Sequence, residues 1–186
     1  MADAPYLDPT AIVDPSARIG SGSRIWNWTK IREGAHIGVN CSVGQCAYID
    51  KNVVIGDECK IQNGVSIFDG ITLGDRVFIG PNATFINDRI PRAHSPGWEI
   101  APTRIETGAS VGANATILCG VTLGAYAMVA AGAMVTRDVP PHGLVMGNPA
   151  RLVDYVTRTG RRLRHDMRLP PPDPAALDDM AGEVGQ

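Results

Sequence analysis

The sequence predicts an all-β solenoid, in which short strands wind into a rod of parallel sheets. Two observations predict it: branched aliphatic residues recur at every sixth position, and a small or β-branched residue follows each of them four positions later. The composition agrees, because 3 Trp, 4 Tyr and 3 Phe among 186 residues leave Ile, Leu and Val to build the core. A single unit cannot bury its apolar face alone, so only stacked turns give a continuous core.

The first block of repeats covers residues 7–84. Its aliphatic positions are Leu7, Val13, Ile19, Ile25, Ile31, Ile37, Val43, Ile49, Ile55, Ile61, Ile67, Leu73 and Ile79. A short strand followed by a tight corner explains this period, whereas a helix period of about 3.6 or a strand alternation of about 2 does not. Glycines that directly follow an aliphatic are expected at corners that need a positive φ. They are Gly20, Gly38, Gly44, Gly56, Gly74 and Gly80.

The period returns in a new phase after an interruption. The second set of aliphatic positions is Ile105, Val111, Ile117, Leu123, Val129 and Val135. Residues 1–148 are therefore expected to form the rod, with residues 86–104 inserted as one long loop. A loop of about 20 residues inside a compact domain is usually functional or disordered, and this one concentrates charged and aromatic residues that are sparse elsewhere.

Residues 149–160 are expected to form a short C-terminal helix. Asn148 suits the N-cap, Pro149 the first helical position and Gly160 the stop. The basic and then proline-rich residues 161–186 are expected to be a mobile tail without an assigned function.

Charge and composition exclude several classes of protein. A formal net charge of -2 provides no basic field for nucleic acid or an anionic membrane. No apolar run approaches the roughly 20 residues of a membrane-spanning helix, and the N-terminus has no signal-peptide pattern, so a cytoplasmic protein is expected. The 4 cysteines form no CxxC pair, and no metal site is expected. Cys41 and Cys59 occupy inward small positions and are expected in the core.

The repeat resembles that of the hexapeptide-repeat acyltransferases, Leu/Ile/Val-Gly-x-x-small-x, over residues 7–84 and 105–140. This resemblance implies a left-handed parallel β-helix with three hexads per turn, usually a homotrimer with active sites between subunits. Residues 87–92, Asn-Asp-Arg-Ile-Pro-Arg, resemble the signature of enzymes that acetylate the 3-amino group of nucleotide-linked amino sugars. The implied function is an acetyl-CoA-dependent N-acetyltransferase for a 3-amino-deoxyhexose, dTDP-linked in preference to UDP-linked, in which the amine attacks the thioester directly.

The length of one turn predicts where the catalytic residues lie. If a turn is three hexads, residues 18 apart stack at about 4.8 Å, which places Asp69 next to Asn87 at the root of the loop. A carboxylate accepts hydrogen bonds and an amide both donates and accepts, so this pair can orient an amine and a neighbouring hydroxyl. His94 is the candidate proton acceptor. The resemblance instead implies transfer without a side-chain base, and both alternatives stay open.

Other residues are candidates for binding the two substrates. The candidates for the amino sugar are Asp88, Arg89, Arg92, Asn63, Phe68 and Trp98. The two arginines would meet the diphosphate or the loop of the next subunit. By resemblance, the pantetheine arm of coenzyme A contacts main chain along an edge of small residues, and two arginines meet its phosphates. These candidates are Gly112, Ala113, Ala131, Gly132, Arg137 and Arg151.

Several alternatives stay open. The column Asn27, Gln45 and Asn63 is either a substrate contact or a structural amide ladder, and Glu33 and Lys51 are expected to be a solvated charged edge. The acceptor could be an amino acid or an antibiotic, or the chain could be a non-catalytic trimeric solenoid that displays its loop to a protein. A carbonic anhydrase would need scattered histidines gathered across an interface. The histidines outside the loop are expected at the surface: His36, His142 and His165.

Overall fold

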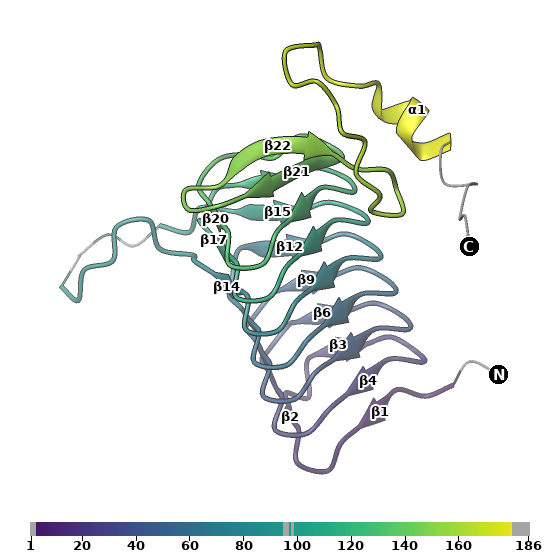
Figure 1. The fold of residues 1–186 in the computed structure, drawn as a ribbon. Coiled ribbons are helices and arrows are strands. Elements are labelled where there is room, and N and C mark those ends of the chain that lie inside the picture. Colours follow the sequence, from purple (N-terminus) through teal and green to yellow (C-terminus); the bar gives the residue numbers. More distant parts are fainter. Residues whose placement is uncertain (1–2, 95–96, 98, 180–186) are drawn as a thin grey trace.

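The computed structural model describes residues 3–94, 97 and 99–179. Figure 1 shows a rod of stacked turns, with the inserted loop projecting from one side and a two-stranded cap at one end. Each complete turn contributes one strand to each of three sheets, which hold nine, seven and six strands. All strand pairs in them are parallel except the last pair of the nine-stranded sheet. This arrangement confirms the predicted left-handed parallel β-helix.

The strands of the rod are two or three residues long. Sheet A holds, in order, β1 (Tyr6–Leu7), β4 (Arg24–Ile25), β7 (Ser42–Val43), β10 (Lys60–Ile61), β13 (Phe78–Ile79), β16 (Ser110–Val111), β19 (Met128–Val129), β21 (Gly143–Met146) and β22 (Arg151–Tyr155). Sheet B holds β2 (Ile12–Val13), β5 (Lys30–Ile31), β8 (Tyr48–Ile49), β11 (Ser66–Ile67), β14 (Thr84–Phe85), β17 (Thr116–Ile117) and β20 (Met134–Val135). Sheet C holds β3 (Arg18–Ile19), β6 (His36–Ile37), β9 (Val54–Ile55), β12 (Ile71–Leu73), β15 (Thr103–Ile105) and β18 (Thr122–Leu123).

The register confirms that one turn is three hexads. Lys60 pairs with Phe78 in sheet A, and Ser66 pairs with Thr84 in sheet B, so residues 18 apart lie on adjacent turns. The second residue of a strand points inward, and the small residue four positions later is buried as well. Cys41 and Cys59 occupy two of these small positions in the core, as expected.

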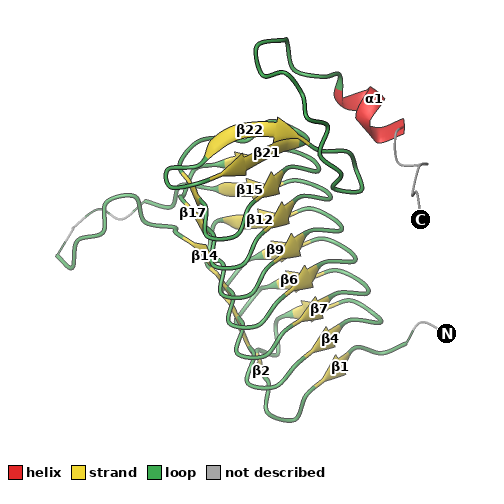
Figure 2. Cartoon of the chain, in the orientation of Figure 1, coloured by secondary structure: helices red, strands yellow, loops and turns green. Residues whose placement is uncertain are grey.

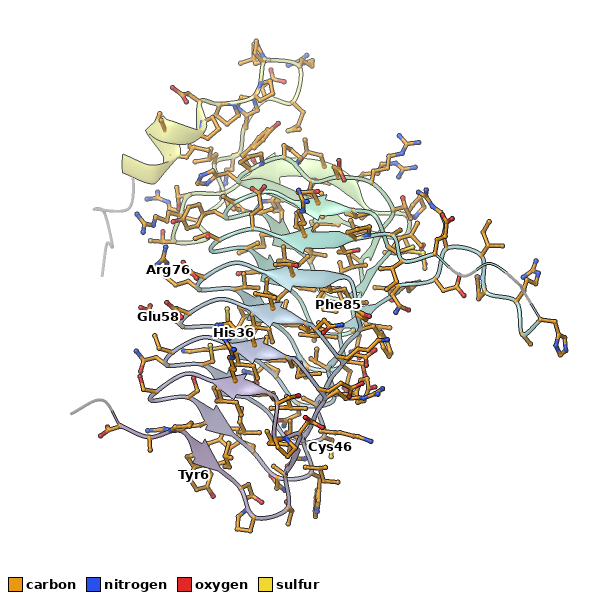
Figure 3. The ribbon with its side chains drawn as sticks, turned by 180° about the vertical axis from the view of Figure 1, so that it is seen from behind. Tyr6, His36, Cys46, Glu58, Arg76 and Phe85 are labelled. Atoms are coloured by element: carbon orange, nitrogen blue, oxygen red, sulfur yellow. The ribbon has the colours of Figure 1, made fainter. Side chains whose placement is uncertain are left out.

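The structure gives a different reason for the glycines that directly follow an aliphatic residue than the positive φ predicted from the sequence. In most hexads the left-handed φ falls on the third residue after the aliphatic. This residue is often not glycine: φ is 58° at Glu58 and 56° at Arg76. Figure 3 shows these two residues one above the other. Gly56 directly follows an aliphatic and has no positive φ, but a Cβ there would lie 2.6 Å from the carbonyl carbon of Gly74. Glycine at this position is needed because successive turns stack too closely for a side chain.

The predicted helix at residues 149–160 is wrong. This segment contains β22, which pairs antiparallel with β21 at the end of the rod. The last turn of sheet A has unpaired backbone groups, which an added strand satisfies and a helix would leave exposed. The helix that the structure does contain is α1 (Pro174–Asp179), beyond the rod (Figure 2).

The segment after the cap is attached to it through a buried carboxylate. Asp154 is only 1% exposed and accepts hydrogen bonds from Arg162 Nε at 2.9 Å and from the backbone N–H groups of Arg164 and His165 at 3.2 and 3.0 Å. Residues 161–165 are therefore part of the folded cap, and the expected start of a mobile tail at residue 161 is corrected. Within the described part of the chain, no helix is long and apolar enough to cross a membrane.

We expect Gly56→Ala to lower the free energy of unfolding by about 1–3 kcal/mol, since the new methyl group overpacks a corner that has no room. The matched control is Gly132→Asn. Gly132 has open space around it and a φ of 69°, close to the 56° of Asn114 one turn below, so this change should cost no more than about 1 kcal/mol. Denaturant unfolding measures both, and a larger loss in Gly132→Asn would contradict the stacking explanation.

Asp154→Asn should destabilise the protein by about 2–3 kcal/mol at neutral pH, because the donors around Asp154 lose an ionised acceptor. Burial raises the pKa of Asp154, but the hydrogen bonds from His165, Tyr155, Arg162 and Arg164 outweigh this, so its pKa lies below the ordinary 3.8. A carboxyl with a depressed folded-state pKa contributes its full stability above its unfolded value and loses that contribution as pH falls through the folded value.

The stability difference between wild type and Asp154→Asn should therefore be constant from pH 8 to about 5 and shrink below about pH 4. Denaturant unfolding at each pH measures it. Asp166→Asn is the matched control, since Asp166 pairs with Arg168 at the exposed surface, where solvent screens the ion pair and its loss should change the stability little. If the difference for Asp154→Asn does not shrink at all between pH 5 and the lowest pH at which both proteins fold, the role of its charge is refuted.

Candidate functional site

Three lines of corners run along the rod and position the candidate site residues. Edge A lies between sheets A and B, edge B between sheets B and C, and edge C between sheets C and A. The inserted loop leaves the rod at edge B, between β14 and β15, and projects away from it (Figure 1). The loop therefore interrupts one edge and leaves the other two continuous.

Asp69 and Asn87 each lie three residues beyond one of two paired strand residues on adjacent turns, at edge B, where the inserted loop leaves the rod. The pairing of Ser66 with Thr84 fixes this register. Both residues are partly buried, and the Asp69 side chain is 16% exposed. Lys51, one turn below, places its Nζ 3.8 Å from Asp69 Oδ2. The expected charged column is thus present, and Asp69 lies next to both a cation and the root of the loop.

A polar network below Asp69 holds its backbone. Asp50 Oδ2 accepts a hydrogen bond from the Asp69 N–H at 3.3 Å, while its Oδ1 accepts from the Tyr48 hydroxyl at 3.0 Å and from Arg32 at 3.3 Å. Arg32 also donates to Glu33 at 2.7 Å. Sequence reasoning missed Asp50 and Arg32, although their spacing of 18 was visible in the period.

The loop carries a second group of predicted residues. Asp88, Arg89 and Arg92 line a hollow of about 480 Å³ formed by the loop. Asp88 Oδ1 accepts a hydrogen bond from the Ile90 N–H at 2.9 Å, which makes a local turn. His94 is exposed and does not line this hollow. Trp98 lies outside the described residues.

Asn63 is not next to Asn87 in one chain, because it lies on edge A. Its Oδ1 accepts a hydrogen bond from the Gln45 N–H one turn below, at 3.1 Å. Asp57 does the same for the Val39 N–H on edge C, at 2.8 Å. The oxygen of Asn63 therefore caps a corner N–H, as in the structural alternative for the column Asn27, Gln45 and Asn63. Phe68 does lie on edge B, directly before Asp69, with its ring 5.8 Å from that of Tyr48.

The predicted row of small residues forms the upper part of edge A, nearest the capped end of the rod. Four of its residues are candidates for contacting coenzyme A, and the backbone N–H groups of two of these are free within the described part of the chain. Gly112 donates to the Val129 carbonyl and Gly132 to the Ala113 carbonyl, each at 2.8 Å. The N–H groups of Ala113 and Ala131 donate to no acceptor among the described residues. Ala131 has no side-chain oxygen to cap the turn below as Asn63 does, so two unused donors lie about 4.8 Å apart.

Arg137 and Arg151 are brought together at the capped end of the rod. Both line a hollow of about 240 Å³ between the last turn and β22. Arg137 follows β20 on edge B, two turns above Asn87. The pair therefore lies at the same end as Ala131 but on the neighbouring edge.

The histidines do not form a metal site within one chain. His36 is exposed on β6, while His142 is at the capped end, beyond β18. His142 was expected at the surface, but it is 1% exposed, with Nδ1 2.9 Å from the Val156 carbonyl oxygen and its ring 5.2 Å from that of Tyr126. The described residues contain no group of three His, Cys, Asp or Glu side chains arranged to hold a metal ion.

Comparison with known proteins decides the family. The family described as "Bacterial transferase hexapeptide (six repeats)" matches residues 52–87, and "Hexapeptide repeat of succinyl-transferase" matches residues 33–69 and 102–137. The dTDP-3-amino-3,6-dideoxy-alpha-D-galactopyranose 3-N-acetyltransferase of Aneurinibacillus thermoaerophilus is 40% identical over 159 residues, which are 86% of this chain and 82% of that protein. The chain belongs to the hexapeptide-repeat acyltransferases.

Solved structures agree with this assignment. A hexapeptide-repeat-containing acetyltransferase from Vibrio cholerae is similar to this hexapeptide acyltransferase with 30% identity and a TM-score of 0.52, over 74% of this chain and 73% of that chain. The acetyltransferase domain of PglB from Neisseria gonorrhoeae, solved with acetyl coenzyme A, has 22% identity and a TM-score of 0.55 over 82% of this chain, which spans 58% of that one; this likeness shows the fold alone. The predicted enzyme class, an acetyltransferase, is confirmed.

Proposed function

We propose that this acetyltransferase moves the acetyl group of acetyl-CoA to the 3-amino group of a nucleotide-linked 3-amino-deoxyhexose, with dTDP preferred to UDP as the nucleotide. The observation that carries the proposal is the 40% identity to an enzyme named for that reaction, over 86% of this chain. The Asp69–Asn87 corner at the loop root supports it, because it offers a carboxylate and an amide to an amine and its neighbouring hydroxyl.

The chemistry needs no nucleophilic side chain. The neutral amine attacks the thioester carbonyl carbon, and a tetrahedral oxyanion forms. The oxyanion collapses, the carbon–sulfur bond breaks, and the coenzyme A thiolate takes up a proton while the amide nitrogen loses one to solvent. Asp69 and Asn87 hold the amine in line with the thioester, so positioning supplies much of the rate.

The free donors of Ala113 and Ala131 suit the amide carbonyls of the pantetheine arm, whose repeat of peptide-like groups matches a row of backbone N–H groups. Arg137 and Arg151 suit the phosphates, since a guanidinium makes bidentate charged hydrogen bonds. The acetyl thioester then extends from the capped end down toward the level of Asn87.

Edge A carries the free donors and edge B carries the loop root, so one chain does not bring them to one place. A homotrimer in which edge A of one subunit faces edge B of the next would do so, as cyclic assemblies join two different surfaces of a subunit. We propose that three such intersubunit sites form.

Purified protein with acetyl-CoA should release free thiol in the presence of a dTDP-linked 3-amino sugar, and faster than with its UDP-linked or 4-amino counterparts. A thiol assay over a panel that also includes amino acids and aminoglycosides measures this. If thiol appears only with an amino acid or an antibiotic, the sugar acceptor is wrong. If no acceptor in the panel releases thiol, the proposal fails altogether.

Asn87→Ala should lower kcat by about tenfold to a hundredfold with the same sugar, as expected for loss of a positioning contact. Asn40→Ala is the matched control, because Asn40 is an exposed corner residue of edge C, which takes no part in the proposed site. His94→Asn should leave the pH–rate profile unchanged. A profile altered by His94→Asn would show that His94 takes the proton.

Ala113→Pro should raise the KM for acetyl-CoA about threefold to tenfold by removing one backbone donor, with little effect on the KM for the sugar. The change is compatible with the fold, since Pro81 already follows a glycine at the same corner one turn below. Ser21→Pro makes the same Gly-Pro pair on edge C and serves as the control. Equal effects of the two changes on KM would exclude a specific role for the Ala113 N–H.

A further inference from the structure

Edge A has a second polar feature, a hollow of about 230 Å³ near the N-terminal end that the proposed reaction has not used. It exists because Gly44 lies between two large side chains at equivalent corner positions, Trp26 one turn below and Gln62 one turn above. The missing side chain at Gly44 opens a space between an indole and an amide. Gly44 has no freedom to fill this space, because a Cβ there would lie 2.7 Å from the Asn63 nitrogen.

The indole that forms one side of this hollow is held in place. Trp26 Nε1 donates to Ser42 Oγ at 3.2 Å, and the ring packs against Tyr6 at 5.7 Å between centroids. Trp26 nevertheless remains 39% exposed. A fixed, partly exposed aromatic ring next to a polar hollow is a stacking platform for a planar ligand, since the side chain loses little freedom on binding.

Amide side chains form the rest of the lining. The side chains of Asn27, Gln45 and Gln62 make no hydrogen bond with the described residues, and Asn63 uses only its oxygen. An amide donates and accepts in one plane, which complements the acceptor–donor–acceptor edge of a thymine or uracil ring. Bases are recognised in this way elsewhere, by stacking on an aromatic ring and hydrogen bonds to the ring edge.

The height of the hollow on the rod fits the substrate of the proposed function. Gly44 and Gln62 belong to the turns of β7 and β10, whereas Asp69 follows β11 and Asn87 follows β14. The hollow is thus within about two turn spacings, roughly 10 Å, of the level of the amine, in the direction away from Arg137. A nucleotide sugar would extend toward the N-terminal end and coenzyme A toward the capped end.

We infer that this hollow binds the pyrimidine base of the nucleotide-linked amino sugar, stacked on Trp26 and read by the amides of Gln45 and Gln62. The inference rests on the proposed function, because it assigns the base-binding part of that substrate. It makes Trp26 a specificity-determining residue that acts on binding and does not take part in the chemistry.

Calorimetric titration of the full-length protein with dTDP tests this directly. Trp26→Leu should raise the Kd for dTDP at least about tenfold, in line with the usual contribution of base–aromatic stacking, and Trp26→Phe should recover most of the loss. Trp28→Leu is the matched control, since Trp28 is two residues away and 63% exposed but does not line the hollow. Thermal melting of each variant checks that it is folded.

With the amino sugar, Trp26→Leu should raise the KM for the sugar and leave the KM for acetyl-CoA unchanged. Absence of dTDP binding to wild type at millimolar concentration would overturn the inference, and so would unchanged binding in Trp26→Leu or an equal loss in Trp28→Leu. A loss of affinity for coenzyme A or ADP in place of dTDP would assign the hollow to the adenine. Acetylation of the sugar with wild-type KM in Trp26→Leu would overturn only this inference, whereas failure of every amino sugar would overturn the proposed function.

Discussion

The stacking of each turn on the next, at the spacing of hydrogen-bonded strands, governs the rest of this molecule. It satisfies backbone groups along the rod and buries Ile37, Ile55 and their equivalents in one continuous column. It also brings corners so close that Gly56 has no room for a side chain over Gly74. Corner residues such as Glu58 accept a left-handed φ because the turns above and below fix their position.

A rod built this way offers little concavity, so binding features arise where the stacking rule is relaxed. At edge B the chain leaves the rod as a loop next to Asp69 and Asn87. At upper edge A, alanine replaces the capping side chains used elsewhere and leaves two N–H groups free. At lower edge A, Gly44 opens a space above Trp26. Each of these features arises where the repeat is interrupted or lacks a large side chain, and the three lie at different heights along the rod.

The two end turns of the described rod each lack a neighbouring turn on one side, and the two ends differ in how they are covered. At the C-terminal end, β22 adds an antiparallel strand to sheet A, and the buried Asp154 carboxylate holds the following segment. At the N-terminal end the described residues form no turn below β1, and Leu7 is 43% exposed although it occupies a core position of the repeat. Burial of an aliphatic in this fold therefore depends on neighbours from adjacent turns.

The sequence by itself determined the hexad and the buried cysteines, because a strict period fixes which side chains point inward. The three-hexad turn, which places residues 18 apart on adjacent turns, is implied by the resemblance to the hexapeptide-repeat acyltransferases. Only the tertiary structure decided that residues 151–155 form a strand and that His142 is buried. The helix-cap pattern at Asn148 depends only on neighbouring residues in the sequence. The unpaired edge of sheet A, which makes this segment a strand, is formed by turns distant in the sequence. The space above Gly44 is likewise formed by residues from different turns.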